Sequence, residues 1–277
     1  MKKNIAIFSL LIFILSAGIS CQENSRTKQQ KDPMHQENTH SKPKDCSGVH
    51  WSHHKGHDGP ENWKNLCDGF ADCGGQRQSP VDIDTKKVTE SADLKAPGFH
   101  YGKTRTRIIN NGHTVQFDVD EGSTVKLNGK DYRLLQFHYH APSEHTVNGR
   151  HYPLEVHFVH QHAGDDLAVI GIFFKEGKKN PLFEKYLNKF PEKEGKYDSA
   201  DLIDLMSLMP DDKSYYYYDG SLTTPPCTEI VSWYVMKQPL EASKDQIEKF
   251  SKILNRNFRP VQPLNGRRIR LYNDKKG

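Results

Sequence analysis

Three histidines in two short stretches of the sequence could hold a metal ion. The stretches are Gln136–His140, QFHYH, and Leu154–His160, LEVHFVH. Side chains alternate between the two faces of an extended strand, so His138 and His140 point the same way. If the two strands pair in antiparallel fashion, His157 can join them, and the three imidazoles converge on one point.

Zinc with an open coordination position for water is the metal that suits this set of neutral nitrogen ligands on rigid strands. A ligating imidazole usually donates its second N–H to an oxygen acceptor. Gln136 and Glu155 each lie two residues from one of the histidines, on the same face. An isolated His-x-His on a strand is more commonly an ordinary surface pair, but three histidines on one face with Gln and Glu beside them favour the metal site.

The elements that must position these residues are mostly strands. Between residues 98 and 174, short alternating or apolar segments recur between Gly and Asn turns, which predicts strands. Helical spacing predicts helices over Leu182–Phe190, Ser199–Met209 and Glu241–Asn255. Residues 51–85 are rich in Gly, Pro and Asn and are predicted to be coil.

The length and charge of the chain limit its class. A chain of 277 residues is expected to hold one domain with a full hydrophobic core once its ends are removed. The net charge of +4 is mild, and the basic residues are scattered without interleaved aromatics, which argues against a nucleic-acid partner.

The N-terminus predicts export. Lys2 and Lys3 precede an apolar run, Ile5–Leu15, and small residues lead to Cys21, which is typical of a bacterial lipoprotein signal. We therefore expect a signal peptide over residues 1–20, lipidation of Cys21 and a periplasmic or cell-surface protein anchored to a membrane. Gly18 departs from that pattern, and plain secretion with a free or paired Cys21 is the alternative. Residues 21–45 are polar and predicted to be a flexible tether.

Cysteine usage agrees with an oxidising compartment. The chain has 5 cysteines, an odd number for an exported protein. Assigning Cys21 to a lipid leaves Cys46, Cys67, Cys73 and Cys227, for which three pairings exist.

The whole set of motifs resembles the α-class carbonic anhydrases. The segments that carry the resemblance are GPENW, RQSPVDID, INNGH, QFHYHAPSEHTVNGRHYPLEVHFVH, LAVIGIFF, GSLTTPPCTE and NFRPVQPLNGR, in the expected order. The resemblance runs from about Trp51 to about Leu271, within a domain assigned to residues 46–277. It implies a mainly β (α+β) fold, with a large twisted, mostly antiparallel sheet, short peripheral helices and Zn²⁺ at the base of a conical cleft.

The resemblance also implies a reaction, the zinc-dependent reversible hydration of CO2 to bicarbonate and a proton. A zinc-bound hydroxide attacks CO2 in this family. Thr223 accepts a hydrogen bond from the hydroxide and donates its own proton to Glu144, which leaves a lone pair free for carbon. His113 corresponds to the histidine that shuttles the proton to buffer. By themselves, Ser-Leu-Thr-Thr-Pro-Pro and Asn-Gly-His would be interpreted as turns.

Further positions are assigned by the same resemblance. The substrate is bordered by Val159, Val169, Leu222, Thr223, Thr224 and Trp233. The residues that support the ligands and the Thr–Glu pair are Gln136, Glu155, Asn257, His145 and Tyr218. One departure concerns the residue two positions after Trp51, which is usually Tyr in the family and is His53 here. His50, His53, His54 and His57 could bind a second metal, although solvated histidines are the simpler interpretation.

The resemblance predicts a disulfide between Cys73 and Cys227. It leaves Cys46 with Cys67 as a second pair, with an intermolecular link as the competitor. Aromatic sulfonamides and anions are the expected inhibitors, and a homodimer is left open. Two other hypotheses remain: a catalytically inactive binding module of the same family, which would typically have lost a zinc histidine, and an exported zinc-buffering protein.

Overall fold

A computed structural model describes residues 45–164 and 166–274 of the chain. Residues 1–44, which include the predicted signal peptide, Cys21 and nearly all of the predicted tether, lie outside the described residues. No helix among the described residues is both long enough and apolar enough to cross a membrane.

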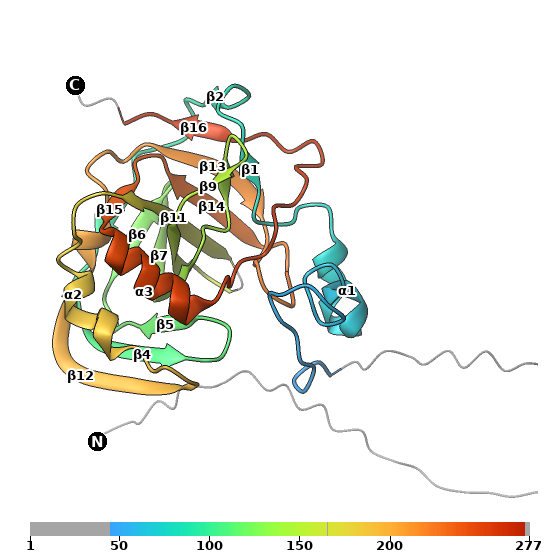
Figure 1. The fold of residues 1–277 in the computed structure, drawn as a ribbon. Helices are drawn as coiled ribbons and strands as arrows, with labels where there is room; N and C mark the ends of the chain where they lie inside the picture. The colour runs from blue at the N-terminus through green and yellow to red at the C-terminus, as the bar shows by residue number, and fades with distance from the viewer. Residues whose placement is uncertain (1–44, 165, 275–277) are drawn as a thin grey trace, which may run out of the picture. The chain divides into compact units, whose positions relative to one another are not determined.

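A 13-stranded sheet dominates the described part of the chain (Figure 1). Most of its strand pairs are antiparallel; β11 with β14, β11 with β15, and β16 with β2 are parallel. The spatial order of the main path is β12 (Gly195–Asp204), β4 (Lys103–Asn110), β5 (Val115–Asp118), β7 (Lys130–His140), β10 (Leu154–Gln161), β11 (Leu167–Glu176), β14 (Val231–Met236), β13 (Tyr215–Gly220), β16 (Arg270–Tyr272) and β2 (Thr89–Glu90). The mainly β, mostly antiparallel fold is therefore the one predicted from the sequence.

The remaining strands are short. Those attached to the large sheet are β3 (Gly98–His100), β6 (Thr124–Leu127) and β15 (Leu240–Ala242). A separate 3-stranded sheet consists of β1 (Asp82–Ile83), β8 (Thr146–Val147) and β9 (Arg150–His151). The hairpin of β8 and β9 lies within the connection between the two histidine-bearing strands.

The helices are short and lie outside the sheet (Figure 1). They are α1 (Trp63–Leu66), η1 (Asp68–Gly74), α2 (Phe183–Tyr186), η2 (Leu187–Lys189), η3 (Leu205–Leu208) and α3 (Lys244–Leu254). The start of α3 is a capping box, in which Ser243 and Gln246 each accept the other's backbone N–H. Its buried residues Phe250 and Leu254 lie on the face predicted from the spacing.

Two predictions about local structure are wrong. Residues 199–204 of the predicted helix Ser199–Met209 are the end of strand β12, which pairs with β4 through a register shift after Ser199. Ladder hydrogen bonds to β4 and the burial of Ile203 outweigh the helical spacing there. The coil predicted for residues 51–85 contains α1 and η1, which are too short for periodicity to reveal.

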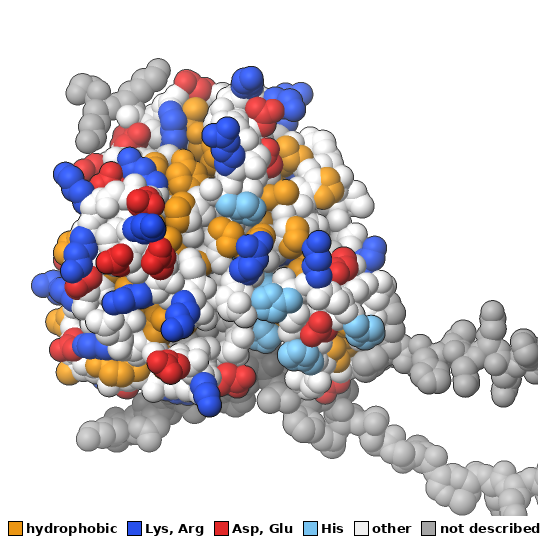
Figure 2. Space-filling view, viewed as in Figure 1, with side chains coloured by type: hydrophobic (Ala, Val, Ile, Leu, Met, Phe, Trp, Pro, Cys, Tyr) orange, Lys and Arg blue, Asp and Glu red, His pale blue; other side chains and the backbone are white. Residues whose placement is uncertain are grey.

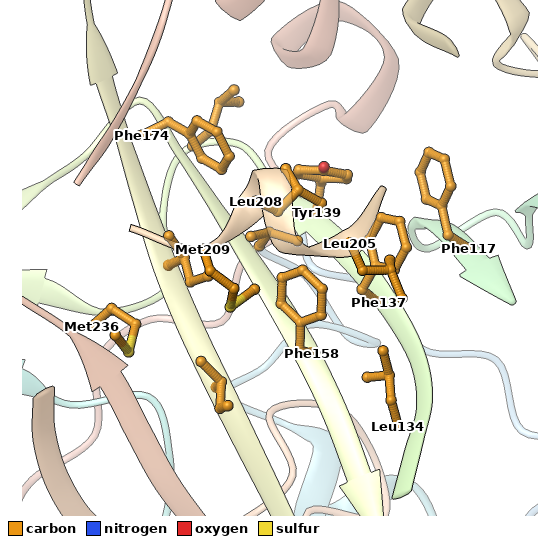
Figure 3. Close-up of a cluster of buried hydrophobic side chains, with 14 of the residues drawn as sticks. Phe117, Leu134, Phe137, Tyr139, Phe158, Phe174, Leu205, Leu208, Met209 and Met236 are labelled. Atoms are coloured by element: carbon orange, nitrogen blue, oxygen red, sulfur yellow. The ribbon is translucent and has the colours of Figure 1, made fainter. Parts of the chain in front are cut away.

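The main core covers the sheet face opposite to the metal-site histidines (Figure 3). Phe137 and Tyr139 of β7 and Phe158 of β10 are fully buried there. The Phe137 ring stacks on Phe117 at 4.5 Å and on Phe158 at 5.2 Å. Each strand is therefore held on one face by aromatic packing, which leaves its other face to present the histidines.

Candidate metal centre

Strands β7 and β10 bring His138, His140 and His157 together. The pairing places His157 directly opposite His138, and Glu155 opposite His140. One nitrogen of each histidine lies within 4.8 Å of one nitrogen of the other two. The alternation of β7 predicts the shared face, and the register with β10 decides that the three rings converge.

Each of the three histidines has an oxygen atom within 2.9 Å of its outer nitrogen. His138 Nδ1 lies 2.9 Å from Gln136 Oε1, and His157 Nε2 lies 2.9 Å from Glu155 Oε1. His140 Nδ1 lies 2.7 Å from the backbone oxygen of Asn257. These contacts leave Nε2 of His138, Nε2 of His140 and Nδ1 of His157 for a common ligand.

The three imidazoles are neutral at pH 7, which is the form that binds a metal. Burial lowers the pKa of His140 to about 4. Burial is also the main reason that the pKa of His138 lies well below its usual value, and it lowers that of His157. His140 Nε2 is buried and has no hydrogen-bond partner among the described residues. A neutral, nitrogen-only donor set, with His140 and His157 buried and His138 half-buried, fits Zn²⁺.

Glu155 is a charged anchor for His157. Burial by itself would raise the pKa of Glu155, but the neighbouring His145 and His157 hold it well below its usual value. Gly171 lies opposite His157 on β11, and a β-carbon there would come within 2.8 Å of Glu155 Oε1. The absence of a side chain at Gly171 therefore leaves room for the Glu155 carboxylate.

His145 and Tyr218 extend this anchor away from the metal site. His145 Nδ1 lies 2.8 Å from Glu155 Oε1, and its Nε2 lies 2.6 Å from the Tyr218 hydroxyl. Tyr218 in turn donates to Ser79 Oγ at 3.0 Å. This chain of contacts supports Glu155 and, through it, His157. The family resemblance had assigned His145 and Tyr218 to the support of the pair Thr223 and Glu144 as well.

Glu144 lies next to the nitrogens that His140 and His157 leave free, and Thr223 lies beside Glu144. Glu144 Oε2 is 3.6 Å from His140 Nε2 and 3.8 Å from His157 Nδ1. Burial raises the pKa of Glu144, while His157, the Arg259 amide and the Thr223 hydroxyl oppose the rise. The Thr223 hydroxyl lies close enough to lower the pKa of the Glu144 carboxyl. The two side chains form no hydrogen bond of ordinary geometry, however.

Arg259 is a supporting residue that sequence reasoning did not find. Its backbone N–H donates to Glu144 Oε1 at 2.8 Å, and its buried guanidinium donates to Gln78 Oε1 and to the backbone oxygens of Ser79 and Cys73. The residue lies in NFRP, beside Asn257. Nothing local in the sequence signals these contacts, because each partner is more than a hundred residues away.

The Thr223 loop is held by a disulfide between Cys73 and Cys227, as predicted, and by a hydrogen bond from Gln78 Nε2 to the Cys227 oxygen at 3.1 Å. Thr224 lies in the same loop, where its oxygen accepts the Cys227 N–H at 2.9 Å. The second pairing, Cys46 with Cys67, is also present.

Apolar side chains from three neighbouring strands lie beside the metal site. Val159 of β10 is opposite Val169 of β11, which is opposite Trp233 of β14. Leu222 packs on the same apolar cluster. The Trp233 ring lies 4.8 Å from that of His157, so this cluster adjoins the ligands.

His113 lies in the turn between β4 and β5. Its ring is stacked on Trp51 with centroids 3.8 Å apart. Burial and the charge of His50 lower its pKa, and Glu194 partly opposes the effect. The side-chain oxygen of Asn111 accepts the backbone N–H groups of His113 and Thr114 and closes the turn.

Comparisons with known proteins agree with this geometry. The sequence profile of the eukaryotic-type carbonic anhydrases matches residues 58–273. A carbonic anhydrase of Neisseria gonorrhoeae is 42% identical over 222 residues, which cover 79% of this chain and 86% of that protein.

Solved structures give the same result. The α-carbonic anhydrase of Thermovibrio ammonificans in complex with sulfanilamide is 44% identical, with a TM-score of 0.77 over 80% of this chain and 99% of that one. A structure of dioscorin complexed with ascorbate is 32% identical, with a TM-score of 0.76 over 82% of this chain and 100% of that one.

Proposed function

Because the chain belongs to the eukaryotic-type carbonic anhydrase family and is a carbonic anhydrase, we propose that it hydrates CO2 reversibly at a zinc ion bound by His138, His140 and His157. The observation that carries the proposal is the convergence of three neutral imidazoles, each with an acceptor at its outer nitrogen. Zinc bound there would lower the pKa of a coordinated water to about 7, a value already established for carbonic anhydrases and taken from them.

Thr223 and Glu144 orient the nucleophile. An ionised carboxylate only accepts hydrogen bonds, so the Thr223 hydroxyl must donate toward Glu144. The Thr223 oxygen can then accept a hydrogen bond from the attacking oxygen. That bond leaves a lone pair of the attacking oxygen directed at the carbon of CO2. Arg259 fixes the other carboxylate oxygen, which keeps Glu144 facing the threonine.

The apolar cluster beside the ligands receives the substrate. CO2 is small and carries no charge, so a wall formed by Val159, Val169, Leu222 and Trp233 can hold it without competing hydrogen bonds. Thr224 borders the position at which the charged product forms.

His113 takes the proton away. A neutral imidazole near the site can accept a proton and pass it to buffer. Burial and His50 lower the pKa of His113, which keeps the ring neutral and ready to accept a proton at pH 7.

Metal removal tests the proposed function. The purified protein should contain one zinc ion and should hydrate CO2 in a stopped-flow assay. Chelation should abolish the activity, and added zinc should restore it. A fully active metal-free protein would contradict the zinc mechanism. An inactive protein that still binds zinc would favour an inactive binding module or a zinc buffer.

Sulfonamides should inhibit the enzyme. A sulfonamide anion would bind a zinc ion held by the three histidines and would donate its remaining N–H to Thr223. The Thermovibrio ammonificans relative is a solved complex with sulfanilamide. Titration of the hydration rate with sulfanilamide, and with anions such as azide, measures this.

We also propose that the enzyme works outside the cytoplasm as a lipoprotein acylated on Cys21. The basic and apolar leader supports this, as does the use of the four remaining cysteines in disulfides. Labelling of the host cells with a palmitate analogue should mark the wild-type protein and not Cys21→Ser. Labelling of both proteins, or of neither, would reject lipidation at this residue.

A further inference from the structure

Thr223 and Glu144 lie on separate segments of the chain, although the proposed mechanism needs them in a fixed relation. Glu144 lies between β7 and β8. Thr223 lies in the connection from β13 to β14, residues 221–230, which is the Thr223 loop. The two side chains form no hydrogen bond of ordinary geometry with each other. Their relative position therefore depends on what each segment is attached to.

The side chain of Gln78 contacts the supports of both segments. Gln78 is 2% exposed, and its Oε1 accepts a hydrogen bond from the Arg259 guanidinium at 2.8 Å. Its Nε2 donates to the backbone oxygen of Cys227 at 3.1 Å and to Glu229 Oε1 at 2.9 Å. The acceptor and both donor hydrogens of this amide are therefore in use.

Arg259 connects Gln78 with Glu144. The backbone N–H of Arg259 donates to Glu144 Oε1 at 2.8 Å. Its side chain is 1% exposed and lies over the Trp63 ring at 5.4 Å. The guanidinium nitrogen that donates to Gln78 also donates to the backbone oxygen of Ser79 at 2.9 Å. The amide that holds Glu144 is therefore coupled to Gln78 through one buried side chain.

Ser79, the next residue, holds the start of the Thr223 loop. The backbone N–H of Ser79 donates to Ser221 Oγ, and the backbone N–H of Ser221 donates to Ser79 Oγ, both at 3.0 Å. A β-carbon at Gly220 would come within 2.2 Å of Ser79 Oγ, so the two segments approach this closely only because residue 220 is glycine.

Glu229 holds the end of the Thr223 loop. Its Oε1 accepts the backbone N–H of Arg77 at 2.6 Å as well as the Gln78 amide. Burial by itself would raise the pKa of Glu229, but Gln78 and Arg77 hold it below its usual value. The carboxylate is therefore ionised at pH 7 and acts as an acceptor. Thr223 lies between the two attachments of its loop to residues 77–79.

We propose that Gln78 is a positioning residue for the hydration step, because its amide fixes the Thr223 loop relative to the Arg259 amide that holds Glu144. This inference rests on the proposed function. Only a side chain with both an acceptor and donors can make these contacts. A Glu of the same length could only accept, and a Lys could only donate.

Gln78→Glu tests the role of the amide in the zinc-loaded enzyme. The substitution keeps the shape and the acceptor for Arg259, but it removes both donors and places a second carboxylate beside that of Glu229. We expect kcat/KM for CO2 hydration to fall about ten- to hundredfold, the range for residues that support a reacting group from one contact away. The kcat in weak buffer should fall less, because the removal of the proton does not involve Thr223.

The double variant Gln78→Glu with Glu229→Gln exchanges the two side chains. The amide at position 229 can then donate to the carboxylate at position 78 and still accept the Arg77 N–H. Since the two residues act through one contact, the double variant should recover kcat/KM to within about fivefold of wild type. A double variant no more active than Gln78→Glu would overturn the inference.

Inhibitor binding provides a readout that does not depend on activity. A sulfanilamide anion keeps one N–H that can donate to Thr223, whereas azide has no hydrogen to donate. In calorimetric titrations of the zinc-loaded protein, Gln78→Glu should weaken sulfanilamide by about tenfold and leave azide within about twofold. A side chain that only stabilises the fold would not change this ratio. Equal losses for the two ligands, or a loss for neither, would reject the positioning role.

Two further variants complete the test. Gln76→Glu adds the same charge at an exposed position two residues earlier and should behave like wild type. Gln78→Met removes the amide without adding charge, so it should show the same selective losses even if Gln78→Glu fails to fold. If the wild-type protein hydrates no CO2, the proposed function itself is wrong. An active wild type whose Gln78→Met variant keeps kcat/KM and the ratio of sulfanilamide to azide affinity would overturn only the role of Gln78.

Discussion

Strands β7 and β10 and residues 46–58, the N-terminal arm, both place histidines near the candidate metal centre, but by different means. His138, His140 and His157 lie on paired strands, with aromatic packing beneath them and an acceptor at each outer nitrogen. His53 lies on a loop, held by ring packing, by two hydrogen bonds from Trp63 and by a disulfide. The strands fix a coordination geometry, whereas the arm borders a polar cavity of about 350 Å³.

Removal of a strand histidine should have the largest effect. His157→Ala leaves two ligands and removes one of the partners of Glu155. Zinc affinity and CO2 hydration should each fall by more than about 100-fold, the upper cost of losing a residue that merely supports a ligand. Metal analysis after dialysis and stopped-flow hydration measure the two losses. His100→Ala, at an exposed position of strand β3, is the matched control. Full activity of His157→Ala would contradict the assignment of the triad.

The next effect should come from Glu144→Gln. The amide keeps the shape and can still accept the Arg259 N–H, but its NH2 group can donate toward Thr223 and reverse that hydrogen bond. We expect kcat/KM to fall on the order of 100-fold while zinc stays bound. Glu248→Gln, on the exposed face of α3, should leave the rate unchanged. A normal kcat/KM in Glu144→Gln would remove the carboxylate from the mechanism.

His113→Ala should have a smaller and more selective effect. In weak buffer kcat should fall by at least about tenfold, and added imidazole should restore part of it, with little change in kcat/KM. In the wild type, His113 must be neutral to accept a proton. Because its pKa is lowered, the acid limb of the kcat profile should lie below pH of about 6.5, the usual value for histidine. A limb above that pH would contradict the predicted environment of His113.

Removal of the disulfides should have the smallest effect on the rate of CO2 hydration. It should also distinguish most clearly between the Thr223 loop and the N-terminal arm. The two cysteines are 154 positions apart in the pair Cys73–Cys227 and 21 positions apart in Cys46–Cys67. The chain-entropy relation gives upper losses in unfolding free energy of about 5 and about 3 kcal/mol, respectively. We expect the double alanine variant of the first pair to affect kcat/KM, because it frees the Thr223 loop. The variant of the second pair should affect kcat alone, because it loosens the segment whose Trp51 stacks on His113. Chemical denaturation and stopped-flow assays on both would show whether the arm and the loop act separately.

The surface carries little information about function. On the face shown in Figure 2, Lys and Arg side chains are interspersed with Asp and Glu. The large exposed hydrophobic residues among those described are Leu202, Met206, Ile230 and Val261, each 38–50% exposed. Such single side chains are ordinary on soluble proteins. The chemistry is concentrated in the buried polar groups around β7 and β10.

Much of the candidate site could be predicted from the sequence because strand alternation is a local property. The period of two puts His138 and His140 on one face and Phe137 and Tyr139 on the other, whatever the strand pairs with. The acceptor of His138, Gln136, follows from the same spacing. The roles of the other site residues, such as Thr223, Glu144 and His113, were assigned from the resemblance to a family and not from the spacing of residues along the chain.

Tertiary structure alone decided the contacts that join distant segments. The backbone oxygen of Asn257 reaches His140 across 117 residues, and Arg259 reaches Glu144 across 115. Residues 199–204 form a strand because they pair with β4, although the spacing of their apolar residues suits a helix. Residue spacing along the chain sets which face a side chain occupies, whereas the partner on that face depends on strand register and loop closure, which are properties of the whole fold.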